Sequence, residues 1–461
     1  MEKSISRRSL LMGGAAGIAG ASAISKATGS MVKNAQTPAV LGGTPVRAHG
    51  LRNDWPVYDA SDIRMLMDSF YSNEWCSLGA SRCVEFEEKW AELNEVPYCI
   101  LTTNGTSALL SSLMALGVGP GDEVITTPYT YSASYGVIFA LNALGVFVDT
   151  DPETQKIDAD LIEDRINEHT RAILPVHIGG GAADMDKILS ISKKYDIPVV
   201  EDACQAWLGE WRGKKLGTLG DTGCFSFNYY KNICSGEGGA IVGSSPNLMD
   251  ICDSITNDGR ASRRKRSKAR TGSERESVGG HPYPGLNFRL TEIQAAILMG
   301  QLQRIEEHQK IRNENFDYLD SLLKEIPGIS PVKRYSGQTR HGCHLYMMSY
   351  EKSYFSGLHK SQFAKAVNAE GIAVSGGYGK SNLSGQVENH LNSRSFQSVF
   401  SKERLEKYRK ENHCPQNDYI AEETGLWMGQ RAFLGTRGDM EDIAEAMAKI
   451  QKSAAQLVGK L

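Results

Sequence analysis

Residues 225–239 read FSFNYYKNICSGEGG, an apolar and aromatic run followed by a lysine, an asparagine and a glycine-rich turn. The turn lies between GCFSF (223–227) and GAIVG (239–243), two short apolar runs that are typical of buried strands. Lysine is rare in such surroundings, because burial disfavours its charged form. The position of Lys231 therefore predicts an amine with a lowered pKa, which can act as a nucleophile.

Apolar runs of the same kind recur from residue 98 onward, and helical patterns separate several of them. The runs expected to form strands are YCILTT (98–103), EVITT (123–127), GVFVDT (145–150), AILPVH (172–177), IPVVED (197–202), GCFSF and GAIVG. Residues 106–117 and 184–196 have apolar side chains at helical spacing. This alternation predicts an α/β fold with a mostly parallel central sheet.

The chain has 461 residues, which is long for a single core, so two lobes are expected. Thr291 and Gln294 fit a capping box that opens one long helix, ending at about residue 325. Later segments interpreted as strands are HLYMMSY (344–350) and GIAVSGGYG (371–379), and those interpreted as helices are QFAKAVNAEG (362–371) and DMEDIAEAMAKIQKSAAQLVG (439–459). We therefore expect a large domain with an N-terminal arm over residues 41–315 and a smaller α+β domain over residues 316–461.

The N-terminus differs from the rest of the chain. Ser6-Arg7-Arg8-Ser9-Leu10-Leu11 precedes a weakly apolar Gly/Ala stretch that is too short for a stable membrane span. This pattern resembles a twin-arginine export signal, with small residues near positions 21–27 as cleavage positions, and it predicts a periplasmic protein. The alternative is a disordered basic tail, which would leave the protein in the cytoplasm. Residues 1–40 are therefore excluded from the fold.

The chain has nine cysteines, an odd number, and no C-x-x-C pair. This pattern favours neither a disulfide framework nor a zinc site. Free cysteines fit poorly with an oxidising compartment. The twin-arginine route resolves the conflict, because it exports proteins that have already folded in the cytoplasm.

The formal net charge is −3, so the chain as a whole does not favour a polyanionic partner. One segment, residues 259–277 (GRASRRKRSKARTGSERES), is strongly basic. Its simplest interpretation is a solvated loop. The alternative is a clamp for an anionic substrate such as a nucleotide-linked sugar. Nucleic acid is not expected, because no aromatic residue lies between the charges.

A buried lysine that forms a Schiff base most often holds pyridoxal phosphate, and this cofactor needs further groups. Asp202 ends a buried strand and would pair with the pyridine nitrogen, and Gln205 could bond the phenolic oxygen. Asn104-Gly105-Thr106-Ser107 opens a helix after a strand, which favours phosphate binding. Ser226 could add a hydroxyl to that site, and Tyr131 could stack on the ring.

These residues lie in segments that resemble the DegT/DnrJ/EryC1/StrS aminotransferases. The matching segments are EFEEKWAELN, NGTSAL, GDEVITTPYTYSAS, GVFVDTD, PVHIGGGAADMD, VVEDACQAWLGEWRGKKLGTLGDTGCFSFNYYKNICSGEGGAIV and GLNFRLTEIQAAILMGQLQRI. The resemblance implies the type I fold of pyridoxal-phosphate enzymes, with three αβα layers and a smaller C-terminal α+β domain.

The resemblance also implies the roles of single residues. Lys231 would be the Schiff-base lysine, with Asp202 and Gln205 as its ring partners, and Thr106, Ser107 and Ser226 would hold the phosphate. Asn287 would reach the phosphate from the partner subunit, which implies a homodimer with shared active sites.

The implied reaction transfers an amino group from glutamate or glutamine to a keto sugar or keto cyclitol. LGGTPVR (41–47) and GGYG (376–379) are similar to segments of relatives that aminate keto-cyclitols or make aminohydroxybenzoate.

Two alternative functions belong to other classes of protein. A dehydratase would have histidine at the position of Lys231, and a non-catalytic binding or sensory protein would not need Lys231, Asp202 and Gln205 together. Trp207 stands where the family usually has histidine or a similar residue, so it either reshapes the pocket or packs in the core. Glu237 either bonds the turn or helps to admit the amino donor.

Overall fold

A computed structural model describes residues 36–51, 54–78, 81–260 and 283–461. Its centre is a sheet in the order β1-β9-β8-β5-β4-β2-β3. The strands are β1 (Tyr98–Thr102), β2 (Glu123–Thr126), β3 (Leu144–Phe147), β4 (Thr170–Leu174), β5 (Val200–Asp202), β8 (Thr222–Ser226) and β9 (Gly239–Gly243). Parallel bridges from Ile173 to Val199 and from Val176 to Asp202 join β4 to β5. Only β9 runs antiparallel within this sheet, so the predicted, mostly parallel sheet is confirmed.

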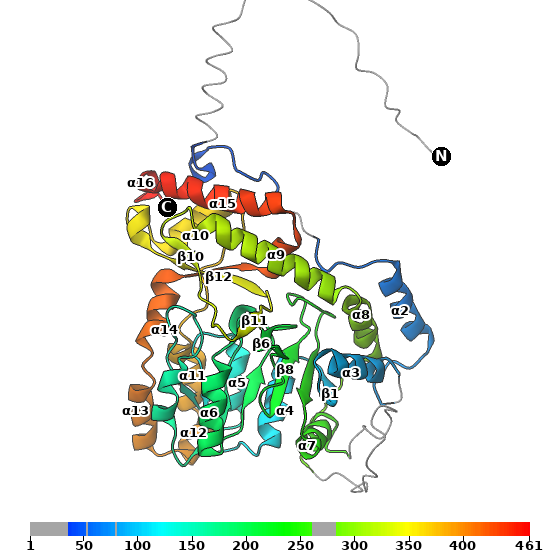
Figure 1. Ribbon diagram of the computed structural model, residues 1–461. Helices are drawn as coiled ribbons and strands as arrows, with labels where there is room; N and C mark the ends of the chain where they lie inside the picture. The colour runs from blue at the N-terminus through cyan, green and yellow to red at the C-terminus, as the bar shows by residue number, and fades with distance from the viewer. Residues whose placement is uncertain (1–35, 52–53, 79–80, 261–282) are drawn as a thin grey trace, which may run out of the picture.

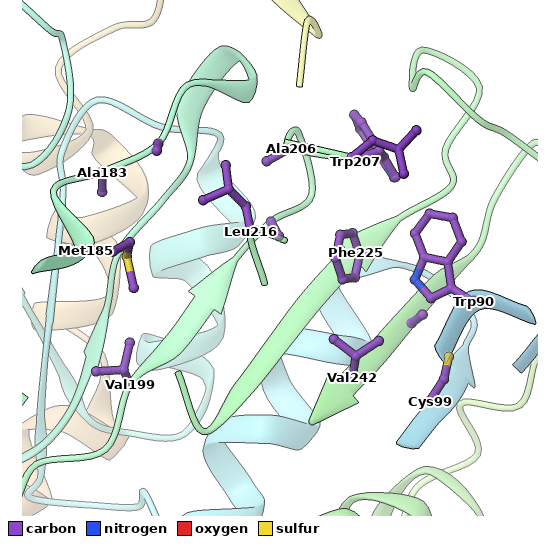
Figure 2. Close-up of a cluster of buried hydrophobic side chains, with 14 of the residues drawn as sticks. Trp90, Cys99, Ala183, Met185, Val199, Ala206, Trp207, Leu216, Phe225 and Val242 are labelled. Carbon is purple, nitrogen blue, oxygen red and sulfur yellow. The ribbon is translucent and has the colours of Figure 1, made fainter. Parts of the chain in front are cut away.

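Helices cover both faces of the sheet, which gives the three αβα layers. The helices are α3 (Arg82–Leu93), α4 (Gly105–Ala115), α5 (Ser132–Ala140), α6 (Met185–Tyr195), α7 (Pro246–Thr256) and α8 (Glu292–Leu302). Successive strand residues point to opposite faces, so Cys224 packs in the cluster with α4, α5 and α7, whereas Phe225 packs in the cluster with α3, α6 and α8. Figure 2 shows this second cluster, in which the Trp90 ring meets Phe225 edge-on at 5.4 Å.

A smaller lobe lies above the sheet in Figure 1. Its antiparallel strands are β10 (Ile329–Pro331), β12 (Leu345–Tyr350) and β13 (Gly425–Gly429), in the order β10-β12-β13. Its helices are α9 (Ile305–Leu323), α10 (Lys360–Ala369), α15 (Arg437–Lys452) and α16 (Ala454–Leu457). The N-terminal arm lies against this lobe, where the Ala39 and Val46 N–H groups donate to the buried carboxylate of Glu370 at 2.7 and 3.0 Å.

Two predicted elements of this region are wrong. The long helix is broken into α8 and α9, because Arg304 leaves helical geometry and donates to Asp62 of α2 (Ala60–Tyr71). The segment 371–379 is not a strand, since Gly377 has φ of +86° and only Ser375 forms a bridge, to Trp427. The capping box at Thr291 and the helix at 360–369 are confirmed.

Residues 385–419 form α11 (Gly385–Leu391), α12 (Arg394–Val399), α13 (Lys402–Glu411) and α14 (Pro415–Tyr419). Although they follow the small lobe in sequence, α11–α13 pack against α5 and β3, at the lower left of Figure 1. Tyr408 donates to the Gly145 carbonyl at 2.5 Å, and Asn412 accepts from the Phe147 N–H at 3.2 Å. The domain limits at residues 40 and 315 stay a prediction.

Short elements complete the described chain. They are β6 (Glu210–Trp211), β7 (Lys214–Lys215), β11 (Gln338–Arg340), the 3-10 turns η1 (Ala39–Leu41), η2 (Ala159–Leu161), η3 (Glu163–Arg165), η4 (Ile178–Gly180), η7 (Lys352–Phe355), η8 (Ser381–Leu383) and η10 (Gln430–Leu434), and the π-turn η9 (Ile420–Thr424). Within the described ranges, no helix combines the length and apolarity needed to cross a membrane. The proposed export signal and most of the basic segment 259–277 lie outside these ranges. All nine cysteines are free thiols.

Candidate active site

A cavity of about 1130 Å³ lies where β1, β2, β5 and β8 end beneath the small lobe. Six of the eight predicted site residues line it: Thr106, Tyr131, Asp202, Gln205, Ser226 and Lys231. Because the carboxyl ends of parallel strands meet at one edge of a sheet, residues far apart in sequence converge there. Ser107 and Asn287 do not line the cavity.

Lys231 sits in a turn that begins as β8 ends. Its N–H donates to the Asn228 carbonyl at 2.9 Å, and the next residue, Asn232, donates to the Gly342 and Cys343 carbonyls at 2.9 and 3.0 Å. Lys231 is half-buried, and desolvation lowers its pKa despite the opposing charge of Asp202. The structure therefore agrees with the predicted lowering of the Lys231 pKa. At a given pH, a larger fraction of this amine is neutral.

Asp202 is buried, and its carboxylate is held from two sides. The Ser134 hydroxyl donates to Oδ2 at 2.7 Å, and the Cys204 N–H donates to Oδ1 at 3.1 Å. Ser134 is itself in contact with the Thr130 hydroxyl at 2.8 Å. These contacts fix the orientation of an anion that lines the cavity together with Lys231.

Gln205 links the two walls of the cavity. Its Oε1 accepts from the Gly179 N–H at 2.8 Å, and its Nε2 donates to the Tyr378 hydroxyl at 2.9 Å. One N–H of the amide is left for a ligand. Tyr378 belongs to the small lobe, and its ring lies 5.5 Å from that of Tyr129, which follows β2.

The start of α4 offers donors for an anion. Asn104 caps the helix. The Ser107 N–H donates to the Asn104 side chain, and the Ser107 hydroxyl donates to the Asn104 carbonyl and accepts from its N–H, so the hydroxyl is part of the helix cap. The N–H groups of Gly105 and Thr106 have no partner within the helix. A Cβ at Gly105 would lie 2.9 Å from the Ser226 Cβ, so only glycine lets the helix start approach Ser226. The three groups form one small cradle.

Tyr131 and Asn287 are placed differently. Tyr131 stands at the N-cap of α5, is 61% exposed and lines the cavity. Asn287 pairs with Asn257 in an isolated bridge, away from the cavity of its own chain. Its expected service to a partner subunit stays a prediction.

The sequence left the roles of Trp207 and Glu237 open, and the structure shows what each side chain contacts. Trp207 is 1% exposed and belongs to the hydrophobic cluster of Figure 2, so it packs in the core, although Lys231 Nζ lies 5.7 Å from its ring centroid. Glu237 accepts from the Asn228 side chain at 2.7 Å, which closes the turn around Lys231, and it also lines the cavity.

Several cavity residues were missed by the sequence analysis: Ser134, Asn228, His344, Tyr378, Gln430 and Arg431. A signal existed for three of them, because Ser134 lies in the PYTYSAS match, Asn228 in the FSFNYYK match and Tyr378 in GGYG. No local pattern indicates His344, Gln430 or Arg431, which come from the beginning of β12 and the end of β13.

The residues present fit pyridoxal phosphate. A half-buried lysine with a lowered pKa, a fixed carboxylate and an anion cradle with a close glycine approach share one cavity, at the carboxyl edge of a mostly parallel sheet. The fold and this donor set define a pyridoxal-phosphate enzyme of the type I fold. Over residues 58–398 the chain matches the family model of the DegT/DnrJ/EryC1/StrS aminotransferases, and it belongs to that family of pyridoxal-phosphate-dependent aminotransferases.

Named relatives agree with this assignment. An L-glutamine:2-deoxy-scyllo-inosose aminotransferase of Streptoalloteichus tenebrarius is 31% identical over 429 residues, 91% of this chain and 98% of the relative. The enzyme of the same name from Streptomyces kanamyceticus is 30% identical over 428 residues, with the same coverage. The crystal structure of 3-amino-5-hydroxybenzoic acid synthase has a TM-score of 0.73 at 26% identity and covers 87% of this chain and 99% of its own. An aminotransferase from Psychrobacter cryohalolentis shares the fold, with a TM-score of 0.74 at 24% identity over 88% and 99% of the chains.

Proposed function

We propose that the enzyme transfers the amino group of L-glutamine to a keto-cyclitol of the scyllo-inosose class. The observation that carries this proposal is the placement of Lys231 and Asp202 in one cavity, in a chain whose relatives are named for this donor and acceptor over nearly their full length. Pyridoxal phosphate, when bound, supplies an electron sink and carries the amino group between the two half-reactions.

Each site residue has a role that follows from its contacts. Lys231, with its lowered pKa, takes the proton from the Cα of the donor and returns a proton at the acceptor carbon. Asp202, fixed by Ser134, would present a negative charge to the ring nitrogen. Gly105, Thr106 and Ser226 would hold the phosphate, Gln205 would offer its remaining N–H to the phenolic oxygen, and Tyr131 would cover the ring face.

A homodimer completes this proposal. Exposed aromatic and apolar side chains lie on α2 or within a few residues of it (Tyr58, Ile63, Met67, Phe70, Tyr71 and Trp75), beside Lys231 (Tyr230) and in the segment before Asn287 (Tyr283 and Leu286). Tyr230 is 73% exposed, although its neighbour Lys231 is half-buried and lines the cavity. A second copy covering this surface would remove it from water and would bring its own Asn287 toward the phosphate cradle.

The proposed export stands on Arg7 and Arg8 and concerns localisation alone. A reporter fused to the native N-terminus should be found in the periplasm, and one with both arginines changed to lysine should stay in the cytoplasm. Equal localisation of the two fusions would refute the signal.

The reaction is tested on the purified protein with added cofactor. The visible absorption of the bound cofactor should fall on addition of L-glutamine and return on addition of a scyllo-inosose, and Lys231→Ala should lack both changes. A colourless protein in excess cofactor would refute the cofactor site. Recovery with a nucleotide-linked keto sugar, but not with a keto-cyclitol, would refute the acceptor and favour the clamp interpretation of residues 259–277.

A further inference from the structure

The small lobe contains a buried lysine that pairs with no carboxylate in the described part of the chain. Lys360, the first residue of α10, is 4% exposed. Its Nζ donates to four backbone carbonyls, at 2.7, 3.1, 2.7 and 3.0 Å, which belong to Gly376, Ile420, Ala421 and Gly425. An ammonium group has three N–H donors, so four oxygens at these distances share them and enclose the charge. These four oxygens form a carbonyl cage whose cation is supplied by the chain itself.

The carbonyl cage favours the charged form of the lysine. Ile420 and Ala421 belong to the π-turn η9, which directly follows α14, and carbonyl groups at the C-terminal end of a helical segment carry a partial negative charge. Burial lowers the pKa of Lys360 to about 8, and the charges of Glu423 and Glu422 oppose this shift. The amine is therefore mainly charged at neutral pH, with all three N–H donors in place.

The Gly376 carbonyl connects this cage to a loop whose Tyr378 lines the cavity. The Tyr378 hydroxyl accepts from Gln205 Nε2 at 2.9 Å, and its N–H donates to the Tyr129 hydroxyl at 3.4 Å. Gly377 has φ of +86°, and a Cβ there would lie 2.5 Å from the Tyr129 hydroxyl oxygen, so the loop passes close to this ring. The loop is thus attached to the small lobe at one end and to the large-lobe wall at the other.

Gln205 is the point where this loop reaches the proposed cofactor site. It is 5% exposed and lines the cavity, and its Oε1 accepts from the Gly179 N–H at 2.8 Å. One N–H of its amide is bound by Tyr378, so this bond fixes the direction in which the other N–H points. Under the proposed function, that second N–H would bond the phenolic oxygen of the cofactor.

We propose that Lys360 is a positioning residue for the cofactor: its ammonium group fixes the loop 376–378, through which Tyr378 orients the Gln205 amide. This inference rests on the proposed function, because it needs pyridoxal phosphate to bind in the cavity. Without the cation, the oxygens of the carbonyl cage would face one another with no donor between them. The loop should then move, and the Gln205 amide should lose its fixed direction, while the contacts of the large-lobe wall are retained.

The experiment is a double-mutant cycle on the Kd of pyridoxal phosphate for the cofactor-free protein, measured by quenching of tryptophan fluorescence. Tyr378→Phe removes the acceptor for Gln205 and should raise this Kd about fivefold. Lys360→Met removes the ammonium group and should raise the Kd by a similar factor. The two changes together should raise it no further, because both release the same amide. Two independent effects would instead multiply to about 25-fold.

The visible absorption of the bound cofactor gives a second measurement. A hydrogen bond to the phenolic oxygen tunes the ring, so at saturating cofactor both variants should shift the absorption maximum in the same direction. Lys365→Met, on the exposed face of α10, is the matched control and should change neither the Kd nor the maximum.

Circular dichroism and the thermal midpoint show whether each variant is folded at the temperature of the titration. If Lys360→Met does not fold, the same cycle is measured with Lys360→Gln, which keeps two N–H donors and should lose less stability.

Two results overturn the inference. An unchanged Kd in the folded Lys360 variant would show that the carbonyl cage does not act on the cofactor site. A rise of about 25-fold in the double variant would show that Lys360 acts independently of Tyr378. Failure of the proposed function differs from both results, because the wild type itself would then bind no pyridoxal phosphate.

Discussion

The cavity has two walls that are built in different ways. The large-lobe wall consists of strand ends and helix starts, and Asp202, Ser226 and Lys231 occur in one stretch of about thirty residues. The small-lobe wall consists of two loops, at residues 376–378 and 430–431, held by distant buried cations. The first wall is fixed by backbone pairing in the sheet, whereas the second depends on single buried side chains, Lys360 for the loop 376–378 and Arg312, 118 residues away, for Gln430. This difference determines which substitutions should reduce catalysis and which should weaken ligand binding or stability.

The largest effect is expected on the large-lobe wall, for Asp202→Asn. The amide keeps the shape and the bond to Ser134 but removes the negative charge, so turnover should fall about 10²- to 10³-fold, as on loss of a preorganised electrostatic group. Single-turnover mixing with L-glutamine, followed by the visible absorption, measures it. Asp196→Asn, at the exposed end of α6, is the matched control and should react as the wild type does. A variant Asp202→Asn with near-normal turnover would show that the charge at this wall is dispensable.

The next effect concerns Lys360, which holds the small-lobe wall. Its Nζ donates to the carbonyls of Gly376, Ile420, Ala421 and Gly425 at 2.7, 3.1, 2.7 and 3.0 Å. Lys360→Met leaves these carbonyls with fewer partners, so the free energy of unfolding in urea should fall by about 2–4 kcal/mol.

Lys365→Met, on the exposed face of the same helix α10, should change the unfolding free energy by less than about 0.5 kcal/mol. A loss for Lys360→Met no greater than that of this control would mean that the loop 376–378 is held by other contacts.

The sequence predicted the first wall well, because its information is local. An apolar run that ends in an acid or a lysine indicates a strand end, and a polar N-cap indicates a helix start, so Asp202, Lys231 and Thr106 could be found without a structure. Ser107 shows the limit of such patterns, since the same hydroxyl could bind phosphate or cap its helix, and the geometry uses it for the cap. Gln430 could not be found, because its role depends on Arg312, over one hundred residues away.

The region between the lobes should show its own dependence on pH. Lys156 is buried there, donates to the Thr154 carbonyl at 2.8 Å and lies against Gly181, and burial lowers its pKa to about 7. In the unfolded chain this pKa is about 10.4, so above pH 7 the unfolded state binds a proton that the folded state releases. The destabilisation by Lys156 is therefore complete below about pH 7 and is relieved as the pH rises.

The measurement is the difference in unfolding free energy between the wild type and Lys156→Met. Between about pH 7.5 and 9 the wild type should gain about 2 kcal/mol relative to the variant, at about 1.4 kcal/mol per pH unit. The apolar methionine has no proton to release, so the variant supplies the baseline for all other groups. Parallel pH profiles would show that Lys156 stays charged in the folded protein.

The smallest effect is expected where the two walls meet, at the 2.9 Å bond from Gln205 to Tyr378. Tyr378→Phe removes the acceptor but keeps the ring, which packs 4.9 Å from Trp427 and 5.5 Å from Tyr129, so the fold should be retained. The loss should be about 1 kcal/mol, or about a fivefold rise in the Kd of pyridoxal phosphate for the cofactor-free protein, measured by quenching of tryptophan fluorescence. Tyr354→Phe, a surface change in the small lobe, is the control. An unchanged Kd would mean that the large-lobe wall alone holds the cofactor, and that the small lobe contributes only to binding of the donor and acceptor.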